Sequence, residues 1–206
     1  KMIAKELHIP VILLSQLNRN VEGHPDGRPA LLALNQVNLS VAQGELVALV
    51  GPSGCGKSTL LGALAGLETL DGGTVELYGH PASGADGRMG FMPQRDQLFE
   101  WRSIYDNVML GLQIRHDRDP AHRRNVEGLL KRYGLWEFAA KRPDQLSGGM
   151  RQRCALIRTL ATQPDILLLD EPFSALDYQT RLAVSKHYRL FCFPINPNLY
   201  QVFLPK

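Results

Sequence analysis

The chain has few cysteines, little excess of either charge and no long apolar run. Its three cysteines, Cys55, Cys154 and Cys192, stand far apart and form no CxxC pair, so neither a disulfide framework nor a zinc site is expected. Lys and Arg number 23 against 20 Asp and Glu. This net charge of +3 is too small to argue for nucleic acid or an anionic membrane as a partner.

No stretch of the sequence is long and apolar enough to predict a membrane-spanning helix. The longest segments without charge, 29–44 and 190–205, are interrupted by Asn, Gln and Pro, and neither reaches the ~18 apolar residues that a span needs. Glu6 and His8 interrupt the region where the apolar core of a signal peptide would lie. A soluble, cytoplasmic chain is expected, and its 206 residues suffice for one domain with a hydrophobic core.

An apolar run near the start predicts a buried parallel strand. Ile9 and Pro10 are followed by four aliphatic residues, which is typical of a strand covered on both faces. Residues 18–30 combine two glycine turn signals with two prolines and predict a loop or linker. Beyond this linker the patterns predict strands at 34–41, 45–50, 74–77, 90–92 and 166–169, and helices at 59–67, 104–112, 120–133 and 151–161.

A glycine-rich loop that matches GxxxxGK[ST] follows the strand at 45–50. Its backbone N–H groups and the N-terminus of the next helix suit a phosphate chain. We expect Lys57 to reach the β- and γ-phosphates, Ser58 to ligate a magnesium ion between them, and Thr59 to contact the α-phosphate. The predicted ATP-binding residues of this loop are Gly51, Pro52, Ser53, Gly54, Cys55, Gly56, Lys57, Ser58 and Thr59.

Two adjacent acids follow the apolar strand predicted at 166–169. Asp170 is suited to hold magnesium through its water shell, and Glu171 to orient and deprotonate an attacking water. Adjacent acids at a strand end also occur on ordinary surfaces. The four aliphatic residues before them, in a chain that has a phosphate loop, favour the catalytic interpretation.

A second anion-binding helix end is predicted at residues 147–149. Ser147 can cap the helix that follows, and Gly148 and Gly149 leave its first N–H groups uncovered, although the same residues could form a plain helix cap. Together, five motifs resemble the Walker A, Q-loop, signature, Walker B and D-loop of the ABC transporter ATPases over about residues 31–190. They are GPSGCGKST, Met92-Pro93-Gln94, LSGGMRQR, ILLLDEP and SALD.

The resemblance implies an α/β P-loop NTPase. We expect a RecA-like mixed core sheet, a small antiparallel part at 34–77 and a helical subdomain at about 95–162. It also implies a head-to-tail dimer, in which each ATP is held by residues 51–59 of one subunit and 147–149 of the other. Glu171, Gln94 and Lys57 are then the catalytic residues, and the magnesium ligands are Ser58, Gln94 and Asp170.

Within the family, GPSGCGKSTLL, Phe99-Glu100-Trp101 and DEPFSALDYQTR resemble most the nitrate, sulfonate and taurine import ATPases. This implies an importer subunit that hydrolyses ATP with Mg²⁺, peripheral on the cytoplasmic face of the plasma membrane. Its partners would be a second ATPase subunit, a membrane permease contacted near Gln94 and, indirectly, a substrate-binding protein, but no nucleic acid. Two alternatives stay open: a truncated nucleotide-binding module with little or no turnover, and an ABC ATPase of DNA repair or translation.

The two ends of the chain depart from the family pattern. The family's adenine-stacking aromatic residue is replaced by the stretch around His24, and no switch histidine follows the D-loop, since His187 falls inside a predicted helix. Residues 1–30 instead resemble a fragment of the C-terminal ATPase domain of DnaB-type replicative helicases, by the run from Lys5 to Glu22. Residues 31–190 are expected to be the ATPase domain, and 191–206 a tail outside the family.

These departures suggest a hypothesis for the core sheet. In both families the strand that ends in the γ-phosphate sensor lies between the phosphate-loop strand and the Walker B strand. A sheet without it would leave two rows of backbone groups unpaired. We therefore predict that residues 9–15 fill the gap as a permuted central strand and bring Gln16 near the nucleotide, with 190–193 and 200–204 as rivals. An origin of both ends in a joining or reading-frame accident is compatible with this prediction.

Overall fold

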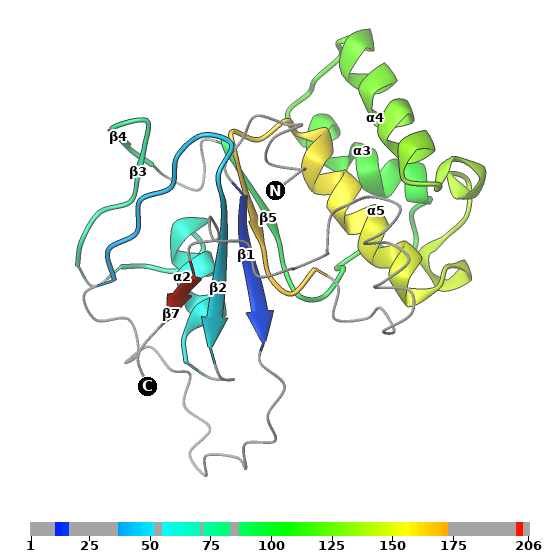
Figure 1. Cartoon of the computed structure of the whole chain (residues 1–206). Helices are drawn as coiled ribbons and strands as arrows, with labels where there is room; N and C mark the ends of the chain where they lie inside the picture. Colours follow the sequence, from blue (N-terminus) through cyan, green and yellow to red (C-terminus); the bar gives the residue numbers. More distant parts are fainter. Residues whose placement is uncertain are drawn as a thin grey trace.

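The centre of the computed structural model is a five-stranded sheet (Figure 1). The structure describes residues 11–16, 37–51, 55–70, 72–82, 87–172 and 201–203. The sheet has the order β5-β6-β1-β2-β7. Its strands are β1 (Val11–Gln16), β2 (Leu46–Gly51), β5 (Met89–Met92), β6 (Ile166–Leu169) and β7 (Gln201–Phe203).

All neighbouring strands of this sheet are parallel. The expectation of a mixed core sheet is therefore wrong for the described residues. Neighbouring strands of this sheet are far apart in the sequence, so none of them are joined by a short hairpin. Parallel strands need a crossover connection, and the long segments between these strands can supply it.

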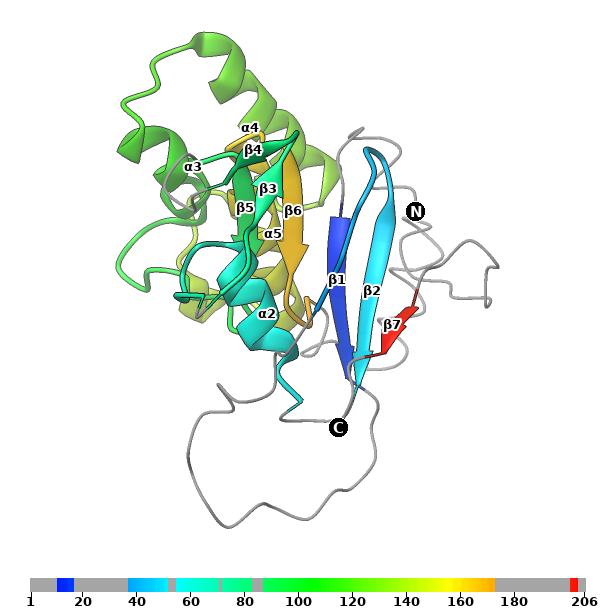
Figure 2. The ribbon, with the colours of Figure 1, turned by 90° about the vertical axis from the view of Figure 1, so that its left-hand side faces the viewer.

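β1 lies in the middle of the sheet, as the sequence predicts. It pairs with β2 from Val11 beside Leu46 to Gln16 beside Gly51, and with β6 from Val11 beside Leu167 to Leu13 beside Leu169. Figures 1 and 2 show the blue β1 next to the cyan β2, with the orange β6 on its other side. The permuted-strand prediction is confirmed, with the strand bounds shifted by one or two residues.

One rival segment forms a strand of its own elsewhere in the sheet. β7, within the predicted segment 200–204, pairs with β2 on the side away from β1, where Gln201 lies beside Ala48 and Phe203 beside Val50. It therefore extends the sheet and does not fill the gap. The other rival, 190–193, lies outside the described residues.

The strands are buried on both faces by residues that alternate. On β6, Leu167 and Leu169 pack with α5 (Gly148–Ala161), whereas Leu168 packs on the opposite face with α2 (Lys57–Leu64). This is the pattern expected of parallel strands covered by helices. Ile166–Leu169, predicted as a strand from its continuous apolar run, is confirmed.

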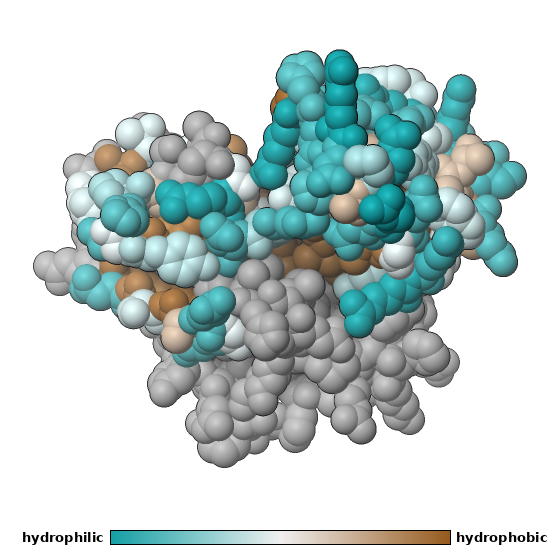
Figure 3. Space-filling model, turned by 90° about the horizontal axis from the view of Figure 1, so that it is seen from above, coloured by the Kyte–Doolittle hydropathy of each residue, from teal (hydrophilic) through white to brown (hydrophobic). Residues whose placement is uncertain are grey.

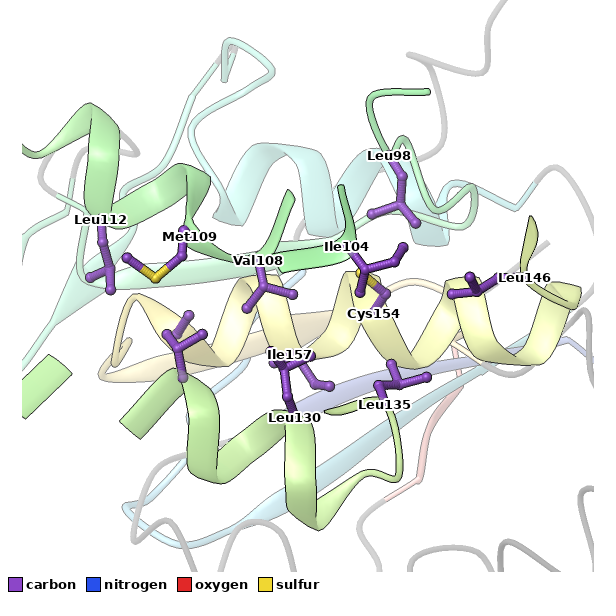
Figure 4. Packing of buried hydrophobic residues seen from close by; sticks show 12 residues of the cluster. Leu98, Ile104, Val108, Met109, Leu112, Leu130, Leu135, Leu146, Cys154 and Ile157 are labelled. Atoms are coloured by element: carbon purple, nitrogen blue, oxygen red, sulfur yellow. The ribbon is translucent and has the colours of Figure 1, made fainter. Parts of the chain in front are cut away.

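The predicted helical subdomain is confirmed. It consists of α3 (Ile104–Ile114), α4 (Pro120–Arg132) and α5, which gather beside the sheet in Figure 1. Each helix has a side-chain cap at its N-terminus, from Ser103, Asp119 and Ser147, as helix starts prefer. Twelve buried residues form the core between these helices, including Val108, Leu130 and Ile157 (Figure 4).

The antiparallel part is smaller than expected. Only β3 (Glu76–Leu77) and β4 (His80–Pro81) pair antiparallel in the described residues, and residues 37–42 form no strand. Val37, Leu39 and Val41 nevertheless pack against the α2 side of the sheet. The alternation of apolar and polar residues at 37–41 shows that one side of this segment is buried. Such burial does not require a hydrogen-bonded neighbouring strand.

The end of the sheet where β1 and β2 begin carries an apolar cavity of about 350 Å³. Ile12, Leu39, Met89 and Ile166 are among its lining residues. Figure 3 views the molecule from this end: hydrophilic residues dominate over the helices, and hydrophobic residues show between the helices and the β3–β4 side. The phosphate loop lies at the opposite end, after β2.

Candidate functional site

The phosphate loop connects the carboxyl end of β2 to the first turn of α2. Gly56 caps α2 with φ 89°, a conformation that residues with a side chain rarely adopt. A Cβ on Gly51 would lie 2.8 Å from Cys55 Sγ, so a side chain at this position would displace the Cys55 thiol. Pro52, Ser53 and Gly54 lie outside the described residues. The predicted contacts of this loop with phosphate stay a prediction.

Lys57, the first residue of α2, is buried with 6% of its surface exposed. Its ammonium donates a hydrogen bond to the carbonyl oxygen of Gly51 at 2.9 Å and lies 3.5 Å from Cys55 Sγ. Burying an ammonium is costly unless polar groups surround it. The loop therefore holds a positive charge in its interior, where an anionic group would be its strongest partner.

Asp170 lies directly after β6 and is 6% exposed. Its backbone N–H donates to the carbonyl oxygen of Met92 at 2.9 Å, which ties it to the end of β5. Burial raises the pKa of the Asp170 carboxyl, a hydrogen bond with Ser58 lowers it, the charge of Glu171 raises it and Lys57 lowers it. Asp170 thus contacts Ser58, in the first turn of α2.

Glu171 and Gln94 are joined by a hydrogen bond. Gln94 Nε2, two residues beyond β5, donates to Glu171 Oε2 at 3.1 Å. Glu171 has φ 44°, in the left-handed region that costs a residue with a side chain of the order of 1–3 kcal/mol and recurs at functional sites. Two residues 77 positions apart, both predicted to act on the nucleotide, therefore meet at the carboxyl end of the sheet.

The residues predicted for the second anion site do not join this group. Ser147 caps α5, and its hydroxyl accepts from the N–H of Met150 at 3.3 Å. Gly148 and Gly149 form the first residues of that helix. In Figure 1 the start of α5 lies on the side of the helical subdomain that is away from β2. Asp177 lies outside the described residues, and Thr59 lies half-buried in the first turn of α2.

Sequence reasoning missed the arginines that hold the Gln94 loop. Arg151 Nε donates to Asp96 Oδ2 at 3.1 Å, and Arg158 donates to the backbone carbonyls of Asp96 and Gln97. The available signal was the spacing of seven residues, which places Arg151 and Arg158 on one side of a helix. Nothing in the sequence indicates which loop they meet.

No described helix is long and apolar enough to cross a membrane. The described residues also contain no group of three His, Cys, Asp or Glu side chains arranged to hold a metal ion. The oxygen atoms of Ser58 and Asp170 are hard donors of the type that Mg²⁺ prefers. Mg²⁺ commonly combines one or two carboxylates with substrate phosphates and water, and these two residues fit that role.

Two family models match parts of the chain. Residues 34–174 match the family described as "ABC transporter", and residues 1–50 match "DnaB-like helicase C terminal domain". The second match contains β1 and overlaps the first at residues 34–50, which include all but the last residue of β2.

Named relatives match the larger part. The uncharacterized ABC transporter ATP-binding protein YtlC of Bacillus subtilis is 45% identical over 152 residues, which are 74% of this chain and 58% of YtlC. The taurine import ATP-binding protein TauB of Jannaschia is 45% identical over 149 residues, 72% of this chain and 56% of TauB. The sulfate/thiosulfate import ATP-binding protein CysA of Pseudomonas syringae is 48% identical over 159 residues, 74% of this chain and 49% of CysA.

A solved structure shares the fold. The cbiO1 protein of Clostridium perfringens, part of the ABC transporter complex cbiONQ, superposes with a TM-score of 0.65 at 29% identity. The match covers 77% of this chain and 65% of cbiO1. The chain spans about half the length of the curated relatives it matches.

Proposed function

The chain belongs to the ABC transporter family, and from that premise we propose that it is the ATP-binding and ATP-hydrolysing subunit of an importer. The P-loop NTPase fold and nucleotide binding follow from the family. The observation that carries the proposal is the convergence of Ser58, Gln94, Asp170 and Glu171, from separate elements, beside buried Lys57 at one end of the sheet. Ligands of open α/β sheets bind at this carboxyl end.

Each residue of this group has a role in phosphoryl transfer. We assign Lys57 to the β- and γ-phosphates, with the backbone N–H groups of residues 51–59 around them. Ser58 and Asp170, with Gln94, would hold Mg²⁺, which neutralises charge on the phosphate oxygens when bound. Glu171 accepts a proton from the attacking water, and the hydrogen bond from Gln94 orients its carboxylate for that task.

A second copy of the chain completes the site in this proposal. The N-terminus of α5, with Ser147, Gly148 and Gly149, lies away from the phosphate loop of its own chain. Helix N-termini attract phosphate because their first N–H groups lack intrahelical partners. A head-to-tail dimer would place this helix end of one copy against the ATP that residues 51–59 of the other copy hold.

We assign Gln16 to the same site on the basis of the strand register. It is the last residue of β1 and pairs with Gly51, the first residue of the phosphate loop. On its other side, β1 pairs with the strand that leads to Asp170. The position between the phosphate-loop strand and the acidic strand supports a role for Gln16 beside the terminal phosphate.

The proposed partners are a membrane permease and, through it, a substrate-binding protein. We place the chain at the cytoplasmic face of the plasma membrane, where ATP is available. TauB and CysA are named for import of taurine and of sulfate or thiosulfate, and these names support import. The transported substrate is a property of the permease and its binding protein.

Replacement of the proposed base tests the activity. Glu171→Gln should lower phosphate release at least about 100-fold, since general bases contribute about 10² to 10⁴, while ATP binding is retained. The matched control is Glu137→Gln, at an exposed position in the helical subdomain, which should leave phosphate release unchanged. Equal turnover in Glu171→Gln would refute the assignment. A wild-type chain that binds ATP and releases no phosphate would instead be the nucleotide-binding module without turnover.

A further inference from the structure

The loop that carries Gln94 is held against α5 by two arginines. Arg158 donates from Nη2 to the carbonyl oxygen of Asp96 and from Nη1 to that of Gln97, both at 2.7 Å. Arg151, two helical turns earlier, donates from Nε to the Asp96 carboxylate at 3.1 Å. We call these four residues the arginine clamp. The clamp engages both the backbone and the side chain of the loop.

The loop is fixed on either side of the clamp as well. At its start, Met92 accepts a backbone hydrogen bond from Asp170. At its end, Leu98 is 7% exposed and lies in the core of the helices, and Phe99 exchanges hydrogen bonds with the fully buried side chain of Asn107. Gln94 lies exposed between β5 and the clamp. The position of Gln94 therefore depends on the contacts that hold Asp96, Gln97 and Leu98.

The backbone of the loop is shaped to fit one guanidinium group. Gln97 has φ 47°, which is unfavourable for a residue with a side chain. The two successive carbonyls of the loop accept from the two Nη atoms of Arg158. A planar guanidinium offers donors in a rigid fork, whereas an ammonium is a single point charge. Lysine therefore cannot reproduce this contact.

The residues around Arg158 leave its guanidinium to bind the loop. Burial lowers the pKa of the Arg158 guanidinium, which nevertheless stays protonated, as arginines in proteins do. Cys154, one turn before it on α5, is a neutral thiol because burial raises its pKa to about 12. The Asp96 carboxylate pairs with Arg151. The loop carbonyls are thus the partners that the structure gives to the Nη donors of Arg158.

We propose that Arg158, with the Asp96–Arg151 pair, is a positioning device that couples α5 to Gln94. The same helix carries Ser147 to Gly149 at its start and the two arginines of the clamp in its first and third turns. Movement of α5 relative to the sheet shifts the loop and changes the Gln94–Glu171 hydrogen bond. The catalytic consequence rests on the proposed function, whereas the attachment of the loop to α5 does not.

Amide hydrogen exchange tests the attachment without requiring activity. In Arg158→Lys, amides of residues 94–98 should exchange about 10-fold faster or more than in the wild type, while amides of α3 and α4 keep their rates. The matched control is Arg153→Lys on the same helix, because Arg153 donates to a single carbonyl, that of Tyr133 at 2.9 Å. Unchanged exchange of 94–98 in Arg158→Lys would overturn the proposal, whether or not the wild type turns over ATP.

A double-mutant cycle tests the catalytic coupling. Arg158→Lys should lower kcat about 10-fold while the KM for Mg-ATP stays within about 2-fold, since a displacement of about 1 Å at a catalytic group can cost up to about 100-fold. In a Gln94→Ala background the same change should have no further effect on kcat. If the two effects multiply, the clamp acts through stability and the proposal fails. If the wild type shows no turnover, the proposed function fails, and the exchange experiment still decides the attachment.

Discussion

Truncation of Ile12 tests whether β1 is the central strand of the sheet. Ile12 is 2% exposed and packs with Val47, Leu49 and Leu168 from the strands on either side. If β1 lies between β2 and β6, Ile12→Ala removes core volume from the middle of the sheet. If β1 lay outside the sheet, the substitution would have little effect. The stability of this variant therefore distinguishes the two arrangements.

The expected loss is about 3–4 kcal/mol. Removal of three buried carbon groups at about 0.8 kcal/mol each gives about 2.4 kcal/mol, and the space left behind adds to this, within the range of about 2–5 kcal/mol for buried Ile→Ala changes. Ile12 also lines the apolar cavity of about 350 Å³, so the neighbouring side chains already border space and cannot close fully over the deletion. At about 2–4 °C per kcal/mol for a chain of this size, Tm should fall by about 10 °C.

Urea unfolding followed by circular dichroism measures this loss. The midpoint should fall while the slope m is unchanged, since the surface exposed on unfolding is nearly the same. Ile114→Ala is the matched control, because Ile114 is 69% exposed on α3 and should change the free energy of unfolding by no more than about 0.5 kcal/mol. Equal midpoints for Ile12→Ala and Ile114→Ala would refute the central position of β1.

Two further predictions concern the acid at the site and the packing of β5. Burial raises the folded-state pKa of Asp170 above that of the unfolded chain, so the stability that this carboxyl contributes is present at low pH and lost as the pH rises through its folded-state pKa. Asp170→Asn should therefore raise Tm at pH 7 and abolish the stabilisation by Mg-ATP in thermal shift assays. A lower Tm of this variant without nucleotide would contradict the prediction. Gly90→Ala would place a Cβ 2.8 Å from a Pro164 carbon atom and should lower the free energy of unfolding by about 1–3 kcal/mol. Gly128→Ala, in α4 with no atom within 4 Å, should raise it by up to about 1 kcal/mol, so urea midpoints that shift in the same direction would show that the packing argument is wrong.

The local elements of this chain are largely predictable from the sequence. The helices of the subdomain are identified by apolar spacing, and the predicted starts at residues 104 and 120 agree with those of α3 and α4. The phosphate loop is predicted from its motif, because the conformation of its glycines is a local property of the backbone. Apolar spacing places the start of α5 at Arg151, whereas the helix begins at Gly148, directly after the Ser147 cap. Periodicity misses the first residues of this helix because Gly148 and Gly149 carry no apolar side chain.

Strand pairing is less predictable, because it is a property of two distant segments. The alternation at 37–41 indicates burial on one side, but the segment has no strand partner in the described residues. The parallel direction of all strand pairs in the core sheet also depends on the connections between strands. The residue pattern of one strand does not predict these connections. The Gln94–Glu171 bond was predictable only as a shared site, and the arginine clamp was not predictable, because both depend on how separate elements pack.

The register of β1 in the sheet depends on both its aliphatic and its polar residues. Residues 11–14 are all aliphatic, so a slip of one residue would cost little through burial, although it would exchange the side chains between the two faces. The polar residues Ser15 and Gln16 remove this ambiguity. A slip that carried them toward the middle of the sheet would bury polar groups at a cost of about 1–3 kcal/mol each. The observed register keeps Gln16 beside Gly51, at the end of the sheet where a polar residue can meet the phosphates of the proposed ATP site.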